Sequence, residues 1–155
     1  LEQRIEKLLE LWQARWGDKP AEHLEAYRSI FTRCFEHDCL YLATMWHEET
    51  PIAARVSFVD RHKGVVSALI SGWDRQYAEL SPGNTLQAYG IRAATEMGMQ
   101  VYDFLRGDEK YKYSVFGAKD SHNTSVVVAR KRLRSMIKSL ITSPRACTDR
   151  ARVVA

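Results

Sequence analysis

The chain has 155 residues, 45% of them hydrophobic and 27% charged, which fits one globular domain with a packed core. Its net charge of +4 comes from the C-terminal end, because eight of the 23 Lys and Arg residues but only one of the 19 Asp and Glu residues lie from Arg130 onward. The rest of the chain is slightly acidic, so the basic balance says little about what the body of the protein binds.

Composition also disfavours several classes of protein. No run approaches the roughly 18 apolar residues of a transmembrane helix, and the Glu-, Arg- and Leu-rich N-terminus is unlike a secretory signal. Cys34, Cys39 and Cys147 are odd in number and lack metal-ligand spacing, which favours a reducing, cytoplasmic setting over a disulfide framework. Since the first residue is Leu1, we expect a processed form or a fragment of a longer protein.

Two helices are predicted first. Apolar residues recur at helical spacing over 1–16, and Gly17 ends that pattern. A second helical pattern covers about 21–36, with Pro20 at its start, where a missing N–H is tolerated.

Three β-rich runs joined by short polar turns come next, over 40–47, 52–59 and 65–72. Their composition and spacing predict an antiparallel meander.

A long loop at 73–83 then precedes a helix predicted over 84–97. Gly98 caps this helix, and a short buried strand follows over 101–105. Strand, helix and strand in this order form the crossover unit of a sheet. The residues expected to face inward are Leu86, Tyr89, Gly90, Ala93, Ala94 and Met97.

Further on, the pattern predicts a strand over 123–129 and a basic amphipathic helix over 130–141. The helix could contact anionic lipid or RNA, but docking of its apolar side on the body is the favoured interpretation. We expect one domain over 1–142 and a basic flexible tail over 143–155. The element order predicts an α/β (α+β) fold, a mixed, mainly antiparallel sheet flanked by helices.

A loop with one glycine opens the helix, at Ser81, Pro82, Gly83, Asn84 and Thr85. A helix N-terminus has unpaired N–H groups and about half a positive charge, so it attracts anions. Two interpretations are open. The helix start could be a phosphate site, where Gly83 would let the phosphate approach the backbone closely, or Ser81 or Asn84 could form an ordinary cap.

The strand at 101–105 leads into a polar turn. Asp103 ends a buried strand, so it must be paired or have a raised pKa. A raised pKa would suit a general base, but an ion pair with Arg106 or Lys112 is the favoured interpretation. Those two cations could instead bind an anionic substrate or stabilise an oxyanion. Tyr111 is either a general acid for a leaving thiolate or a core aromatic.

Trp73 and Tyr77 lie in the long loop, where they could line an acceptor pocket or cover the core. Asp108 and Glu109 are expected to be solvated. The five histidines are scattered, without metal-ligand spacing or a nearby nucleophile. We therefore expect no metal and no covalent intermediate, a chemistry in which holding two reactants side by side does most of the work.

The stretch 77–112 resembles a family signature. Its features are Tyr77, Ser81-Pro82-Gly83, a helix ending at Gly98, Asp103-Phe104, Gly107 and Tyr111-Lys112. They resemble the FemAB-like, or CelD-type "acetyltransferase 6", branch of the GNAT acyltransferase superfamily. The resemblance covers about 20–130. Mainstream members carry more glycines before the same helix, whereas this chain has one.

The resemblance implies a GNAT-like fold and an N-acyltransferase. The donor would be acetyl-CoA or another acyl-CoA, with its phosphates at 81–85, and no metal would be needed. The acceptor would be an amine of a small molecule or of a bacterial cell-envelope or polysaccharide precursor, attacking directly in a ternary complex. The implied site residues are Asp103, Tyr111 and Lys112 for catalysis and Trp73, Tyr77 and Arg106 for substrate binding.

Two alternatives stay open. The donor could be an aminoacyl-tRNA, as in FemAB-like enzymes, with the basic C-terminal segment as the RNA contact. The chain could also be a non-catalytic half-domain, such as the C-terminal half of a tandem protein, that pairs as a homodimer or with a companion GNAT-like domain.

Overall fold

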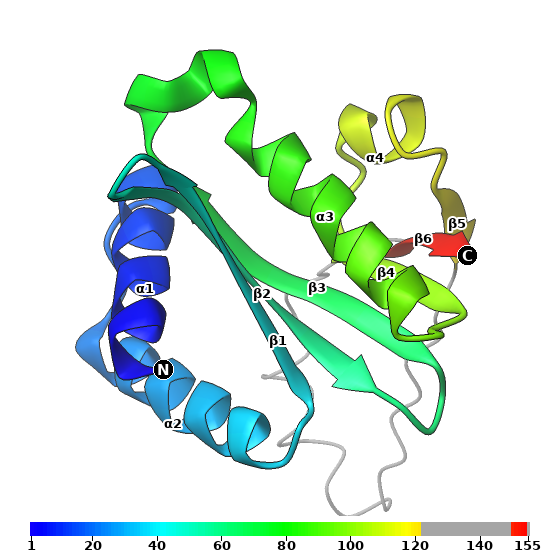
Figure 1. Cartoon of the computed structure of the whole chain (residues 1–155), viewed down its shortest axis with the longest axis horizontal. Coiled ribbons are helices and arrows are strands. Elements are labelled where there is room, and N and C mark those ends of the chain that lie inside the picture. Colours follow the sequence, from blue (N-terminus) through cyan, green and yellow to red (C-terminus); the bar gives the residue numbers. More distant parts are fainter. Residues whose placement is uncertain (122–149, 155) are drawn as a thin grey trace, which may run out of the picture.

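The computed structural model describes residues 1–121 and 150–154 (Figure 1). Two helices precede a three-stranded meander, and a short 3₁₀ helix, η1, leads into the third helix and the remaining strands. No helix in the described part of the chain is long and apolar enough to cross a membrane. The elements are α1 (Glu2–Trp16), α2 (Ala21–Glu36), β1 (Leu40–His47), β2 (Thr50–Asp60), β3 (Val65–Trp73), η1 (Arg75–Leu80), α3 (Pro82–Glu96), β4 (Val101–Arg106), α4 (Lys110–Ser114), β5 (Lys119–Ser121) and β6 (Arg150–Val154).

The strands form one six-stranded sheet in the order β1-β2-β3-β4-β6-β5. β1, β2 and β3 make the antiparallel meander that the sequence predicts. α3 connects β3 to β4, which pair in parallel, and β6 lies antiparallel between β4 and β5. The predicted mixed, mainly antiparallel sheet flanked by helices is therefore confirmed.

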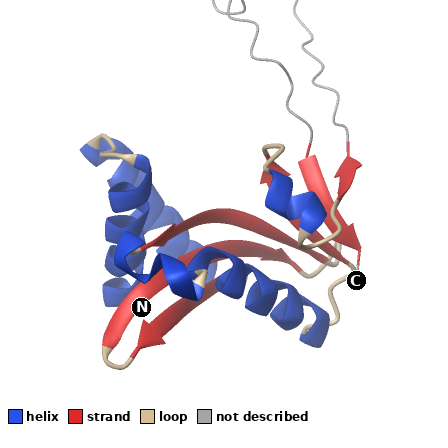
Figure 2. Cartoon of the chain, turned by 90° about the horizontal axis from the view of Figure 1, so that it is seen from above, coloured by secondary structure: helices blue, strands red, loops and turns tan. Residues whose placement is uncertain are grey.

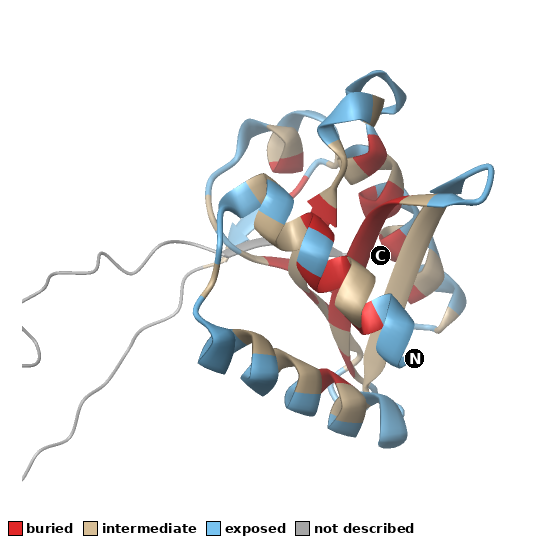
Figure 3. Cartoon of the chain, turned by 90° about the vertical axis from the view of Figure 1, so that its left-hand side faces the viewer, coloured by how far each residue is buried: buried red, intermediate tan, exposed pale blue. Residues whose placement is uncertain are grey.

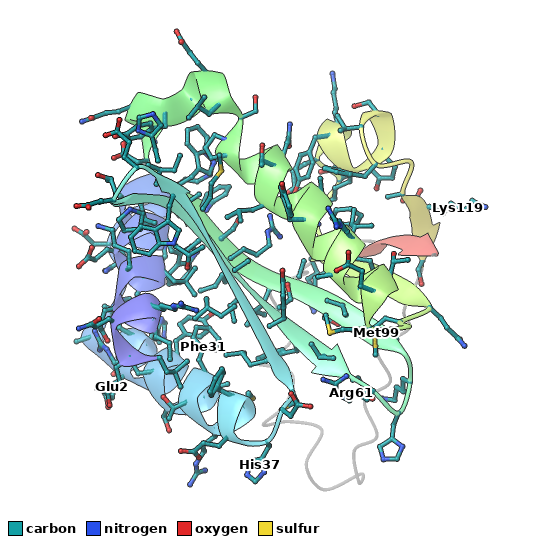
Figure 4. All side chains as sticks on the ribbon, viewed as in Figure 1. Glu2, Phe31, His37, Arg61, Met99 and Lys119 are labelled. Atoms are coloured by element: carbon teal, nitrogen blue, oxygen red, sulfur yellow. The ribbon has the colours of Figure 1, made fainter. Side chains whose placement is uncertain are left out.

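Helices cover both faces of this sheet (Figures 1 and 2). α1 and α2 pack on one face, where Phe31 of α2 is fully buried (Figure 4). α3 crosses the other face, over a second core that includes Val66 and Tyr102. Figure 3 shows the buried positions gathered between these layers. Because side chains alternate along β2, Ala54 and Val56 face α1 while Arg55 faces the α3 side.

α1 lies directly on β3 at Gly72. A Cβ at this position would overlap the backbone of Leu11 and Trp12, so only glycine allows this approach. The indole N–H of Trp16, in the last turn of α1, donates to the carbonyl of Ser71 at 3.3 Å. The end of α1 is thereby fixed over the end of β3.

The long predicted loop is instead mostly regular structure. η1 occupies Arg75–Leu80, and α3 begins at Pro82 rather than at residue 84. The carboxylate of Asp74 accepts the N–H of Gln76 at 2.9 Å and so starts η1. This local cap is the reason that a polar stretch without apolar periodicity is helical.

Within α3, the predicted inward face is correct for Leu86, Gly90 and Ala94 and wrong for Tyr89, which is 57% exposed. Gln87 takes its place and is fully buried. Gln87 lies three residues before Gly90, on the same side of the helix. Its position on the helix therefore buries it, although its side chain is polar.

The C-terminal predictions need correction. The sequence does not predict α4 or β5, and β6 falls within the stretch expected to be a flexible tail. β4 would otherwise present an unpaired edge, and the segment Arg150–Val154 supplies the missing backbone partners. The strand predicted over 123–129 and the basic helix predicted over 130–141 lie outside the described residues.

Candidate active site

β3 and β4 pair over only part of their length. Their ladder joins 65–67 to 101–103, whereas β3 continues to Trp73 and β4 to Arg106. Two adjoining cavities, of about 350 and 180 Å³, lie beside these unpaired ends. Both cavities are lined by Trp16, Arg55, Ser71, Glu109 and Tyr111.

The larger cavity reaches the first turn of α3, through Ser81, Pro82, Gly83 and Asn84. Ser81 is the N-cap, in the left-handed conformation (φ 47°, ψ 48°), and its side chain makes no capping hydrogen bond. Thr85 does not line the cavity, and its hydroxyl donates to a carbonyl of η1 at 3.3 Å. The ordinary cap by Ser81 is thus not formed, which leaves the helix start suited to an anion.

An indole and a guanidinium lie beside this helix start. A Cβ on Gly83 would be 3.3 Å from Nε1 of Trp73, so the glycine lets the helix approach the indole closely. Cζ of Arg15 lies 4.5 Å from the centre of the Trp73 ring. Burial, and then the charge of Arg75, lower the pKa of Arg15, which stays a cation at neutral pH.

Arg55 lines both cavities from β2, the strand next to the edge strand β1. Its side chain is buried, with 7% of the residue exposed. Nη2 lies 3.4 Å from Oγ of Ser71, and Nε has no hydrogen-bond partner among the described residues. A buried guanidinium therefore faces the cavity with part of its donor capacity unused.

Lys112 of α4 closes the turn that follows β4. It is 2% exposed, and its Nζ donates to the carbonyls of Arg106 at 3.0 Å and Gly107 at 3.2 Å. The same ammonium lies 2.7 Å from Oε2 of Glu109. The lysine therefore fixes both the turn backbone and the carboxylate beside the cavities.

The two titratable side chains of this turn have shifted pKa values. Burial by itself raises the pKa of Glu109, but hydrogen bonds from Lys112 and from its own N–H, with the charge of Lys112, outweigh burial and lower it. Burial raises the pKa of Tyr111, and the charge of Arg55 only partly opposes this. At neutral pH the site thus presents a carboxylate and a protonated phenol, which can accept and donate hydrogen bonds respectively.

The sequence matches one family model, described as Acetyltransferase (GNAT) domain, over residues 1–113. The chain belongs to this GNAT family. The match begins at residue 1, so α1 is part of the family domain, whereas the sequence resemblance was expected to begin near residue 20. No curated protein sequence matches the chain.

Solved structures resemble the GNAT domain over nearly its whole length. A putative GNAT acetyltransferase from Desulfovibrio desulfuricans aligns with a TM-score of 0.66 at 11% identity, covering 99% of this chain and 94% of the other. PaiA N-acetyltransferase from Thermoplasma acidophilum, in complex with coenzyme A, gives 0.58 at 11% identity, covering 97% and 90%. A Bacillus subtilis acetyltransferase in complex with CoA gives 0.55 at 12% identity, covering 98% and 90%. At these identities the likeness shows the fold.

Asp103 lines neither cavity of the GNAT domain, although the family resemblance implies a catalytic role for it. It is 1% exposed, and Oδ1 accepts the N–H of Leu105 at 2.8 Å. Leu105 has a φ of 58°, a conformation that is uncommon for a residue with a side chain. Asp103 therefore supports the bend that ends β4, and its role as a base stays a prediction.

The other predicted residues divide between the site and its surroundings. Arg106, Tyr111 and Lys112 line the smaller cavity. Tyr77 lines neither cavity, and its ring lies 5.2 Å from that of His47. Glu109 is half exposed, as expected for a solvated turn residue, and it is also the ion-pair partner of Lys112.

Three charged residues of the site were not predicted: Arg15, Arg55 and Glu109. Arg55 carried a usable signal, because a charged residue in the middle of the apolar run of β2 needs a reason. Arg15 carried none, since an arginine in the last turn of an amphipathic helix is ordinary. Within the described residues, no group of three or more His, Cys, Asp or Glu side chains could hold a metal ion.

Proposed function

We propose that this domain transfers an acyl group, in the simplest case acetyl, from an acyl-CoA to an amine, by direct attack in a ternary complex. The observation that carries the proposal is the uncapped start of α3 at the rim of the cavity beside the diverging strands. The N–H groups and dipole of such a helix start bind phosphate well. Membership of the GNAT family and the CoA complexes of similar folds support the same donor.

In this proposal the donor phosphates lie at 81–84, where Gly83 permits close approach of the backbone. Arg15 adds positive charge nearby, held in place by the ring of Trp73. The acyl thioester then extends along the gap between β3 and β4 toward the polar turn after β4. Thr85 stabilises the helix start through its contact with η1 rather than by touching the donor.

At the turn, Glu109 and Tyr111 serve the chemistry. The amine nitrogen forms a bond to the acyl carbon while the carbon–sulfur bond breaks. Glu109 attracts the ammonium form of the acceptor and accepts one proton from it, which passes to solvent because half of that side chain is exposed, and the neutral amine then attacks. The nitrogen loses its second proton as the amide forms, and this proton reaches the departing thiolate through the Tyr111 hydroxyl, so the CoA thiol leaves. Lys112 holds Glu109 in place and is a positioning residue here.

The resemblance to FemAB-like and CelD-type domains favours a cell-envelope or polysaccharide precursor as the amine, in the cytoplasm of a bacterium. The aminoacyl-tRNA donor and the non-catalytic half-domain are the competing hypotheses. Neither accounts for an uncapped helix start beside Arg15 at the cavity as directly as an acyl-CoA donor does.

The deciding experiment is calorimetric titration of the full chain with acetyl-CoA, with 3′-dephospho-CoA and desulfo-CoA as controls. We expect micromolar binding of acetyl-CoA. The proposal would be overturned by a folded sample that binds none of these ligands and whose melting temperature none of them changes.

A further inference from the structure

Arg55 is the most deeply buried cation of the cavity walls after Lys112, and the donor site proposed above does not use it. Burying a guanidinium is costly unless an anion compensates it. The ion pairs among the described residues do not include Arg55. Glu109, whose carboxylate lines both cavities with Arg55, is paired with Lys112. The protein therefore maintains a buried positive charge at the cavity.

The polar groups around Arg55 only partly satisfy it. Its contact with the Ser71 hydroxyl is long, at 3.4 Å, and Nε has no partner within the described part of the chain. The hydroxyl groups of Ser57 and Tyr102 lie on the same face of the sheet, and contacts of the Tyr102 hydroxyl with Arg55, Ser57 and Gln87 partly oppose the rise of its pKa on burial. These groups are neutral, so they leave the charge of Arg55 uncompensated. A buried guanidinium with an unpaired N–H group at a cavity is suited to a planar or tetrahedral anion, which it can bind through two N–H groups.

Arg55 lies apart from the proposed phosphate-binding residues of the donor site. The helix-start residues 81–84 line only the larger cavity, whereas Arg55, Glu109 and Tyr111 also line the smaller one. Arg55 thus lies where the cavities join, next to the residues to which we assign the chemistry. A group bound there belongs to the acceptor side of the reaction.

We propose that Arg55 binds an anionic group, a carboxylate or a phosphate, carried by the acceptor amine, while Glu109 holds the ammonium end of the same molecule. This inference rests on the proposed function and narrows its substrate class. The acceptor is an amine with a negative charge close to the nucleophile, because both charged side chains line cavities of only about 350 and 180 Å³. Neutral and purely cationic amines leave the buried guanidinium uncompensated.

The test compares matched pairs of acceptors with the full chain and acetyl-CoA, following release of the CoA thiol. Amino acids are paired with their carboxamides, and glucosamine 6-phosphate with glucosamine, so the two arms distinguish carboxylate from phosphate. We expect the anionic member of at least one pair to be preferred by about 10- to 100-fold in kcat/KM, the range for a charge-assisted hydrogen bond. Equal rates within every pair would overturn the inference, and so would a domain that binds acetyl-CoA but acetylates no anionic amine.

Variants of Arg55 identify the responsible residue. Arg55→Gln should raise KM for the anionic amine about 10- to 100-fold, leave KM for its neutral partner unchanged, and keep acetyl-CoA affinity within about twofold. Arg55→Lys keeps the charge without the planar fork and should retain part of the preference. The matched control is Arg61→Gln, an exposed arginine at the far end of β2 that pairs with Asp38 (Figure 4).

The outcomes separate the two proposals. If Arg55→Gln weakens acetyl-CoA binding instead, Arg55 holds a donor phosphate and the inference is wrong, while acyl transfer stands. If the parent chain fails to bind acetyl-CoA at all, the proposed function fails and this inference with it. If the Arg55 variants do not fold, the paired acceptors with the parent chain still decide the substrate class.

Discussion

Lys112 and Glu109 form an ion pair of 2.7 Å in which the lysine side chain is 3% exposed and the glutamate side chain 50%. The buried member also donates to the carbonyls of Arg106 and Gly107. The residue that holds the turn after β4 therefore also sets the protonation of the carboxylate at the cavity. In the proposed mechanism, one ammonium group therefore couples stability to catalysis.

Lys112→Met should destabilise the domain by about 2–4 kcal/mol, because it leaves two turn carbonyls without their donor and removes a buried ionic partner. Urea unfolding followed by circular dichroism measures this. Lys110→Met, a change of an exposed lysine on the same short helix, is the control and should stay within about 0.5 kcal/mol of the parent. Equal stability of the two variants would contradict the bracing role of Lys112.

Glu109 should govern the acid limb of the pH profile. Its pKa is lowered in the folded protein, so the stability that it adds is present above its ordinary value of 4.5 and is lost as pH falls through the lowered folded pKa. The carboxylate form persists to lower pH than usual, and kcat/KM should hold down to that range. Loss of Lys112 removes the main influences that lower this pKa, so the limb should move to higher pH in Lys112→Met. If the acid limb of the kcat/KM profile does not move in Lys112→Met, a group other than Glu109 causes that limb.

Glu109→Gln tests the proton acceptor directly. We expect kcat to fall by about 10²- to 10⁴-fold, the usual contribution of a positioned acid or base, with acetyl-CoA affinity unchanged. Asp108→Asn removes the neighbouring carboxylate, which lines neither cavity, and should leave turnover intact. If Asp108→Asn is the slower variant, the roles within this turn have been assigned to the wrong residue.

Much of the fold follows from local pattern. The two N-terminal helices, the meander and the crossover through α3 are set by apolar periodicity and turn residues, and the structure agrees with them. β6 departs from prediction because its place depends on the edge of β4, a partner distant in the chain. η1 departs because one carboxylate, on Asp74, starts it.

The site was predicted less completely than the fold. The helix start at 81–84 and the turn at 106–112 were identified from their residues, and both line the cavities. Arg55 and Arg15 come from elements that carry no site motif. Arg15 reaches the cavity only because α1 packs on β3, and Arg55 only because its side chain faces the α3 side of the sheet. Sequence spacing cannot reveal that α1 packs on β3, whereas the charge of Arg55 inside an apolar strand could have been recognised.

Gly83→Val should weaken acetyl-CoA binding at least tenfold, about 1.4 kcal/mol. The added side chain would meet the indole of Trp73 and occupy the space over the first turn of α3. Ala88→Val places the same β-branched residue at an exposed position of the same helix and controls for helix propensity. Calorimetry compares the acetyl-CoA affinities of the two variants. Equal affinities would mean that the donor phosphates do not bind at 81–84.

Gly72→Ala should destabilise the domain by about 2 kcal/mol or more, which for a chain of this size lowers Tm by roughly 4–8 °C. Its Cβ would overlap the backbone of Leu11 and Trp12, so α1 must move away from β3. That shift would carry Arg15 and Trp16 away from the cavity, and acetyl-CoA affinity should fall together with stability. Ser67→Ala, a small change on the same strand outside this contact, should alter neither property by more than about 0.5 kcal/mol. A Gly72→Ala domain with parental Tm and affinity would show that α1 does not need to lie this close to hold the site together.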